Sequence, residues 1–180
     1  MSRAFLKNET ADDPVVIPAR APLPPGVPNY VTPRGLALLR TELSELDTER
    51  AHLQAGDVDD PDRTRLLAEL NGRIGALNQR IASAKVVDAH TQPHDEVRFG
   101  ATVVLRTLPT GNTTAKSEER QLTIVGVDEA DAAQGRIAFT APIARAMQGK
   151  RVSDLVSLRT GRGEQVMEVM SISYTESYRT

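Results

Sequence analysis

The sequence predicts an α+β protein in which an antiparallel helical hairpin is followed by a small, mostly antiparallel β domain with one short helix. Leucine and isoleucine recur at alternating steps of three and four residues in two consecutive segments, which is the spacing of a narrow coiled-coil seam. After residue 96 the pattern changes to short β-type runs separated by turn residues. With 180 residues, of which 39% are hydrophobic, the chain suits one domain or two small ones.

Residues 1–29 are predicted to form a proline-rich extension that is extended or disordered. Seven of the eleven prolines lie within the first 33 residues. Proline removes a backbone donor and restricts the residue before it, so this stretch favours neither a helix nor an inner strand. It would serve as a flexible leader, or it would bind a partner as a polyproline II segment.

Residues 30–88 are predicted to form the hairpin. Thr32 is a suitable N-cap and Pro33 suits the first helical position, so the first helix begins there. It should end near Ala55 or Gly56, which makes this arm about 34 Å long at 1.5 Å per residue. Its apolar seam consists of Leu36, Leu39, Leu43, Leu46 and Leu53.

The second helix is signalled by Asp60 as an N-cap and Pro61 at the first helical position. Its seam follows the same alternating steps as that of the first helix. Two matched seams joined by a short acidic turn indicate an antiparallel coiled coil. The members of the second seam are Leu67, Leu70, Ile74, Leu77, Ile81 and Ala84.

Residues 97–176 are predicted to form the β domain, and residues 89–96 a linker before it. Proline near the start of the segment 141–147 and Gly149 after it delimit a single short helix. The predicted strands lie within residues 101–108, 120–127, 136–140, 154–158 and 164–174.

The turn between the two helices gathers four carboxylates within six residues: Asp57, Asp59, Asp60 and Asp62. Oxygen ligands of this kind suit hard divalent cations. A structural explanation is equally available, because Asp60 would cap the second helix and Asp62 would complement its dipole. The residues themselves leave both interpretations open.

Composition excludes several classes of function. A net charge of −2 provides no overall basic field for a nucleic-acid backbone, and the absence of cysteine excludes disulfides, thiolate metal sites and cysteine nucleophiles. No apolar run could cross a bilayer, and the N-terminus lacks a signal segment. We therefore expect a soluble cytoplasmic protein that is not an enzyme by itself. His90 and His94 are interpreted as linker residues, since Pro93 between them prevents a helical metal-binding pair.

Four runs in the second half of the chain carry a resemblance: IVGVDEAD at 124–131, APIARAMQGK at 141–150, DLV at 154–156 and GRGE at 161–164. Together they closely resemble the C-terminal domain of the bacterial Gre transcript cleavage factors, the GreA/GreB family. The run YVTPRGL at 30–36 resembles the family's opening before its coiled coil. The resemblance covers about residues 30–175.

This resemblance implies a β domain similar to the FK506-binding fold and a partner, the bacterial RNA polymerase core. The protein would be an accessory transcription elongation factor that binds at the polymerase's secondary channel and reaches nucleic acid only through the polymerase. We do not expect a prolyl isomerase, because such a pocket is lined by aromatic side chains. Phe99, Phe139 and Tyr174 are too sparse and scattered in the sequence to line one.

The resemblance also implies a role for the acidic turn. In Gre factors a tip with the pattern G-D-x-x-E-N enters the channel and helps to hold a second Mg²⁺, with which the polymerase cleaves backtracked RNA. Asp57 and Asp60 would then be the metal-assisting pair at the partner's active site, and Asp57, Asp59 and Asp60 the Mg²⁺ ligands. The protein would need no cofactor of its own, since that Mg²⁺ would be shared with RNA polymerase.

Two departures from the family pattern keep a second function open. Asp60 stands where Glu is expected and Pro61 replaces Asn. The hairpin is also shorter than a full Gre hairpin by on the order of two turns per arm, roughly 10 Å of reach. In this the chain is similar to the regulator of nucleoside diphosphate kinase. A non-cleaving occupant of the channel is therefore one alternative, and a coiled-coil adaptor acting through its proline-rich leader is another.

The predicted partner-binding residues of the β domain form two groups. Arg145 and the acidic residues are interpreted as polar contacts at the rim of an interface. For Pro142 and Ile143, packing of the short helix against the sheet is the competing explanation. The full set is Asp128, Glu129, Asp131, Pro142, Ile143 and Arg145.

Overall fold

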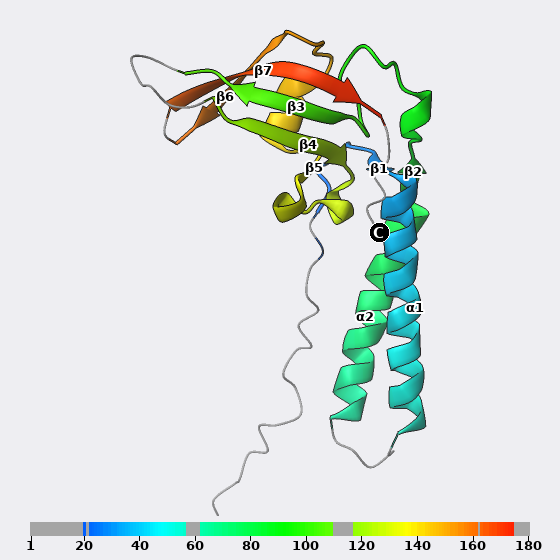
Figure 1. Ribbon diagram of the computed structural model, residues 1–180. Helices are drawn as coiled ribbons and strands as arrows, with labels where there is room; N and C mark the ends of the chain where they lie inside the picture. The colour runs from blue at the N-terminus through cyan, green and yellow to red at the C-terminus, as the bar shows by residue number, and fades with distance from the viewer. Residues whose placement is uncertain (1–19, 21, 57–61, 110–116, 162, 175–180) are drawn as a thin grey trace, which may run out of the picture.

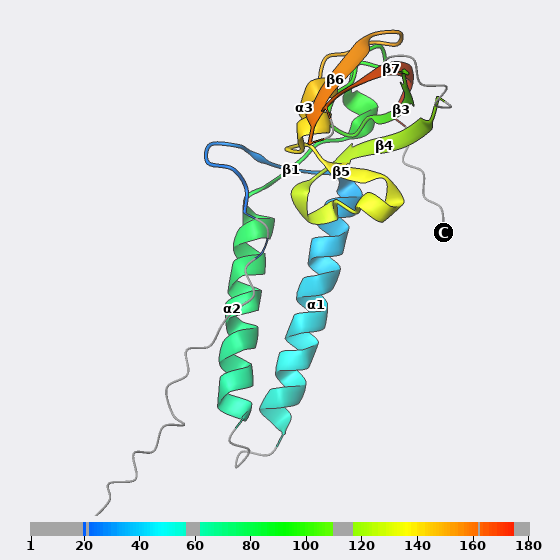
Figure 2. The same ribbon diagram turned by 90° about the vertical axis from the view of Figure 1, so that its left-hand side faces the viewer.

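The computed structural model describes Arg20 and residues 22–56, 62–109, 117–161 and 163–174. A two-helix arm projects from a small sheet domain, and the two helices lie side by side in both views (Figures 1 and 2). The elements in chain order are β1 (Asn29–Val31), α1 (Pro33–Ala55), α2 (Arg63–Ala82), β2 (Ala84–Val86), the 3₁₀ turn η1 (Ala89–Thr91), β3 (Thr102–Thr107), β4 (Glu119–Val125), η2 (Val127–Glu129), η3 (Ala132–Gln134), β5 (Arg136–Ala138), α3 (Pro142–Met147), β6 (Leu155–Thr160) and β7 (Gly163–Ser173).

The start of α1 confirms the predicted N-cap. Thr32 has an extended backbone, and its Oγ1 accepts a hydrogen bond from the Gly35 N–H at 2.8 Å. Pro33 occupies the first turn, where its missing N–H would have had no helical acceptor. The helix ends at Ala55, as predicted, and the Gly56 N–H bonds to the Leu53 carbonyl at 3.3 Å.

The start of α2 corrects a prediction. Asp60 and Pro61 lie outside the described residues, and the helix begins at Arg63 with Asp62 at the N-cap position. The Leu66 N–H donates to the Asp62 carbonyl at 3.0 Å, so the helix begins two residues after the predicted first position. Capping patterns in a sequence locate a helix end only to within one or two residues.

The two predicted seams form one packed core between the helices. Leu39 and Leu46 of α1 are 2% and 4% exposed, and Leu77 of α2 is fully buried. This burial in a narrow stripe confirms the apolar pattern, while the supercoiled geometry of a coiled coil stays a prediction. The other buried members are Val31, Leu70 and Ile74, flanked by the half-buried Leu36, Leu43, Leu53, Ile81 and Ala84.

A short two-stranded sheet at the base of the hairpin was not predicted. β1 and β2 pair in parallel, with Asn29 opposite Ala84 and Val31 opposite Val86. The end of the predicted proline-rich extension is therefore part of the folded structure. Arg20 and residues 22–28 contain no helix or strand, and residues 1–19 and 21 lie outside the described residues.

The second sheet has the strand order β5-β4-β3-β7-β6. Its neighbours are antiparallel except for β4 and β5, which pair in parallel. All five predicted strand segments contain an observed strand, and α3 lies where the short helix is predicted. The result is a mixed α+β domain, and its likeness to the FK506-binding fold stays a prediction.

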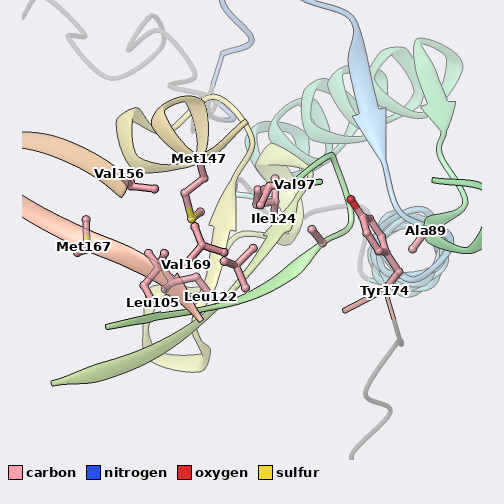
Figure 3. Packing of buried hydrophobic residues seen from close by; sticks show 13 residues of the cluster. Ala89, Val97, Leu105, Leu122, Ile124, Met147, Val156, Met167, Val169 and Tyr174 are labelled. Carbon is pink, nitrogen blue, oxygen red and sulfur yellow. The ribbon is translucent and has the colours of Figure 1, made fainter. Parts of the chain in front are cut away.

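The core of this domain lies between α3 and the sheet. Figure 3 shows Met147 extending from α3 toward Val169 and Leu105 of the strands. All three are 1% exposed or less, and aliphatic residues supply most of the remaining core, in keeping with the low aromatic content. The other buried members are Ala89, Val97, Ala101, Val103, Leu122, Ile124, Ala144, Val156, Met167 and Tyr174.

The predicted linker is fixed to the sheet domain by specific contacts. Asp88 caps η1 by accepting from the His90 N–H at 2.9 Å. Tyr174 donates its hydroxyl hydrogen to the Glu96 carbonyl at 2.5 Å and accepts from the Arg98 N–H at 2.9 Å. The path from the hairpin to the sheet thus contains a capped turn and is joined to the sheet domain through Tyr174. No helix within the described ranges combines the length and apolar character that a membrane crossing requires.

Candidate functional site

Among the described residues, Arg63 joins the two helices at the far end of the hairpin. Arg63 Nε donates to the Leu53 carbonyl at 2.8 Å, and Arg63 Nη2 donates to the Gln54 carbonyl at 2.9 Å. These carbonyls belong to the last turn of α1, where backbone acceptors lack helical partners and the helix dipole favours a cation. Arg63 therefore joins the beginning of α2 to the end of α1, at the end of the arm away from the sheet domain (Figure 1).

The predicted metal-assisting residues belong to the connection between these helix ends. Asp57, Asp59 and Asp60 lie outside the described residues, so their role as Mg²⁺ ligands stays a prediction. Asp62 is described: its side chain is 71% exposed and lies 3.9 Å from Arg65 Nε. Elsewhere in the described part of the chain, no three His, Asp or Glu side chains are grouped so as to hold a metal ion.

The base of the hairpin contains a buried carboxylate, Glu129. Its side chain is 4% exposed, and one oxygen lies 2.8 Å from Arg34 Nη1. The other oxygen accepts a hydrogen bond from the Thr32 hydroxyl, so the N-cap of α1 is joined directly to the sheet domain. Gly35 makes this approach possible, because a Cβ at that position would lie 2.7 Å from Glu129 Oε2.

The neighbouring carboxylate, Asp128, contacts two arginines from different segments. Arg20 Nη1 lies 2.9 Å from Asp128 Oδ1, and Arg80 Nε of α2 lies 3.3 Å from Asp128 Oδ2. Arg20 also pairs with Glu42 of α1. Burial lowers the pKa of Arg20, but its hydrogen bonds and charge interactions with Glu42 and Asp128 outweigh burial and raise it above the ordinary value. Its guanidinium therefore stays charged.

The three acidic residues predicted to contact a partner thus have different surroundings. Asp128 and Glu129 are engaged with residues of their own chain, in η2 at the base of the hairpin (Figure 2). Asp131 is exposed, accepts from the Ala133 N–H at 3.1 Å and lies 3.7 Å from Arg136 Nη2. Contact of all three with a partner stays a prediction, and internal pairing is the established role of the first two.

The predicted residues of the short helix also separate. Ile143 is half-buried and packs on the core of the sheet domain, which is the packing role considered for it from the sequence. Pro142 is exposed in the first turn of α3, so packing does not account for it. Arg145 is exposed and lines a cavity of about 290 Å³.

That cavity corrects the expectation that the aromatic side chains are scattered. Tyr30, Phe99 and Phe139 come from three distant segments, yet their ring centroids lie 5.7–5.9 Å apart in mutual contact. All three rings line the cavity, with Arg98 and Arg145 among its polar lining. The premise used against a prolyl isomerase is therefore wrong for these rings, while the absence of that activity stays a prediction.

His94 and Tyr174 lie apart from this cluster. Their rings meet edge to face, with centroids 5.5 Å apart. This contact gives His94 a packing partner at the linker. His90 is exposed within η1, in keeping with its interpretation as a linker residue.

Sequence reasoning missed the arginines of the hairpin base. Arg20 falls in the predicted extension, and Arg80 lies off the apolar seam of α2, where solvation is the ordinary expectation. The pair Asp128 and Glu129 within the motif of residues 124–131 was the available signal, since consecutive acids after a buried strand need partners when they are not solvated.

The fold and these sites first define a class: an α+β protein whose sheet domain carries a projecting two-helix arm with an acidic connection between the helices. The family described as "Transcription elongation factor, GreA/GreB, C-term" matches residues 92–174. Transcription elongation factor GreB of Neisseria meningitidis serogroup A is 34% identical over 160 residues, which cover 81% of this chain and 94% of that protein. The chain belongs to the GreA/GreB family.

Some relatives match a smaller part of the chain. Transcription elongation factor GreA of Chelativorans sp. is 43% identical over 103 residues, covering 57% of this chain and 62% of that protein. Among solved structures, a GreA/GreB factor from Nitrosomonas europaea is 23% identical over 81% of this chain and 98% of its own, with a TM-score of 0.39. At that TM-score the structural likeness adds nothing to the family assignment.

Proposed function

We propose that this protein regulates transcription elongation by binding bacterial RNA polymerase. Its membership of a family whose relatives are named transcription elongation factors carries the proposal. The sheet domain would dock at the rim of the secondary channel and the hairpin would enter it. The ion pairs and hydrogen bonds that connect the hairpin base to the sheet domain are called here the joint. They support this arrangement, since an arm that enters a channel must keep its direction.

Binding to the polymerase is the first test. The full chain should comigrate with core polymerase in a native gel, and Arg145→Ala should weaken the complex because Arg145 is exposed beside the aromatic cavity. Arg120→Ala, on the exposed face of β4, is the matched control. Absence of any complex with core polymerase would refute the proposal.

Within this function, we propose that the tip carboxylates assist cleavage of backtracked RNA. Carboxylates suit Mg²⁺, and Asp57 and Asp60 would add ligands to a metal ion that the polymerase holds, with Asp59 beside them. Arg63 supports the role by holding the two helix ends from which the connection runs. The protein itself would perform no catalysis.

Stalled elongation complexes test this step. Wild type should shorten the transcript, the double variant Asp57→Asn/Asp60→Asn should not, and Glu49→Gln should behave as wild type. Glu49 is an exposed carboxylate on α1, which makes it a matched control for loss of charge.

A non-cleaving channel occupant is the second candidate function, and the length of the arm favours it. α1 contains 23 residues, about 34 Å at 1.5 Å per residue. An arm that ends roughly 10 Å from the metal supplies only a long-range field. In that case wild type would compete with other channel-binding factors and change pausing, without shortening RNA.

The adaptor hypothesis makes a separate prediction. Deleting residues 1–19 would abolish the activity of a protein that acts through its leader. A channel-binding factor would retain its complex with polymerase after the same deletion, because Arg20 and the following folded residues remain.

A further inference from the structure

The segment before the hairpin makes contacts that tie three parts of the molecule together. The guanidinium of Arg20 pairs with Glu42 on α1 and with Asp128 on η2, and its side chain is 24% exposed. Asp128 faces Arg80 of α2 through its other oxygen. Arg20 therefore connects the hairpin to the sheet domain from outside both.

A turn between Arg20 and β1 fixes the path of this segment. The Val27 N–H bonds to the Pro24 carbonyl at 3.1 Å, and Gly26 has φ +76°. Proline at the second position and glycine with positive φ at the third are the pattern of a type II turn, here Pro25 and Gly26. A turn of this kind leaves few alternative directions for the chain.

The same segment borders the sheet domain. Pro24 and Val27 line the aromatic cavity together with Phe139 and Ala144 of that domain. Beyond the turn, Asn29 enters β1 and donates from Nδ2 to the Arg80 carbonyl at 2.8 Å. The segment is thus held at its start by ion pairs and at its end by a strand, and its middle borders the aromatic cavity.

We propose that Arg20 and residues 22–28 form a strap, a segment that fixes the direction of the hairpin relative to the sheet domain. The ion pairs of Arg20 hold this strap in place. The physical basis is the position of the two carboxylates. Glu42 moves with the hairpin and Asp128 with the sheet domain, and one planar guanidinium donates to both. A change in the angle between the two parts separates at least one pair.

The absence of cysteine allows a direct measurement of this angle. Spin labels on Ala51→Cys of α1 and Ser157→Cys of β6, both at exposed positions, report the distance between the arm and the sheet by double electron–electron resonance. The parent should give one narrow distribution. In Arg20→Ala, the population of hairpin orientations other than that of the parent should rise roughly fivefold. This is the change produced by losing about 1 kcal/mol of ion pairing.

Matched variants separate positioning from general stabilisation. Arg20→Lys should be intermediate, because an ammonium is a point charge and does not bridge two carboxylates as a guanidinium does. Arg40→Ala should leave the distribution unchanged: Arg40 is exposed on α1, and no ion pair joins it to the described part of the chain. Glu42→Gln should broaden the distribution as Arg20→Ala does, should the latter fail to fold.

An unchanged distance distribution in both Arg20→Ala and Glu42→Gln would overturn the proposal, even if the melting temperature falls, since a lower melting temperature alone indicates stabilisation without positioning. The measurement uses no polymerase. Its failure would therefore leave the proposed function intact, and failure of polymerase binding would leave the strap intact.

Discussion

The two ends of the hairpin are held by different chemistry. At the base, the buried Glu129 joins the first turn of α1 to the sheet domain, and Asp128 is paired with arginines from two segments. At the far end, Arg63 donates hydrogen bonds to two backbone carbonyls of the neighbouring helix. Among the described residues, particular pairs of side chains thus specify the base, whereas a cation near a helix terminus joins the helices at the far end.

Burial along the seam is greatest between these two ends. Leu77 is fully buried, whereas Leu53 near the far end and Ile81 near the base are both half-buried. Regions with few buried apolar contacts open locally at lower free energy than the rest of a protein. Both ends of the seam should therefore open more readily than its middle, but the ion pairs of Asp128 and Glu129 hold the base in addition.

The largest expected effect comes from the seam. Leu77→Ala removes a fully buried side chain and should lower the free energy of unfolding by about 2–5 kcal/mol. Leu53→Ala removes a half-buried one and should cost about 1 kcal/mol. Urea unfolding followed by far-ultraviolet circular dichroism measures both. Equal losses in the two variants would show that burial does not decide how much a seam leucine contributes to stability.

A smaller effect is expected at the buried carboxylate. Glu129→Ala removes the acceptor of the Thr32 hydroxyl and the partner of Arg34, which should cost about 2 kcal/mol. The figure is below that for a fully buried pair because Arg34 is 36% exposed and can be solvated after the change.

The control for this prediction is an exposed carboxylate on α1. Glu49→Ala should change the free energy of unfolding by less than about 0.5 kcal/mol in the same urea experiment. If Glu129→Ala were as mild, the ion pairs at the base would contribute little, and apolar packing alone would fix the joint.

The elements of this fold were predictable where the signal is local. The Thr32 cap, the alternating leucines and the five β-type runs depend on neighbours within a few residues, and the structure places a helix or strand at each. The error at the start of α2 is of the same local kind, because several acids before Arg63 are equally good caps.

The base of the hairpin was not predictable in the same way. The contact of Thr32 with Glu129 spans 97 residues, and that of Arg20 with Asp128 spans 108. The aromatic cluster likewise joins Tyr30 to Phe99 and Phe139. Periodicity and motif spacing carry no information on such pairs, since they arise from how whole elements pack. Composition therefore located the acidic connection between the helices, but no pattern in the sequence showed the contacts that join the hairpin base to the sheet domain.

The contacts of Tyr174 with the linker can be tested through the pH dependence of the free energy of unfolding. Burial raises the pKa of its phenol, an effect that the hydrogen bond from Arg98 opposes and the charge of Glu96 reinforces. The unfolded chain releases this proton near pH 10 and the folded chain only at higher pH. The contribution to stability is therefore complete below about pH 10 and lost as the pH rises above it.

Tyr174→Phe should remove that alkaline component and cost about 1 kcal/mol at neutral pH, because the Glu96 carbonyl and the Arg98 N–H lose their partner. Urea unfolding at about pH 8 and about pH 11 measures both quantities. A variant as sensitive to alkali as the wild type would mean that other groups cause the alkaline loss.

The smallest effect is expected at the far end of the hairpin. Arg63→Ala removes two hydrogen bonds to backbone carbonyls, and water can bond these carbonyls instead. The global free energy of unfolding should therefore fall by only about 0.5–1 kcal/mol. Amide hydrogen exchange should nevertheless accelerate in the last turn of α1 and the first turn of α2 and stay unchanged at the base. Arg65→Ala is the matched control, since its contact with Asp62 is a long, exposed ion pair at 3.9 Å. Faster exchange throughout both helices would show that the two ends of the hairpin open together and that the contrast between them has no energetic basis.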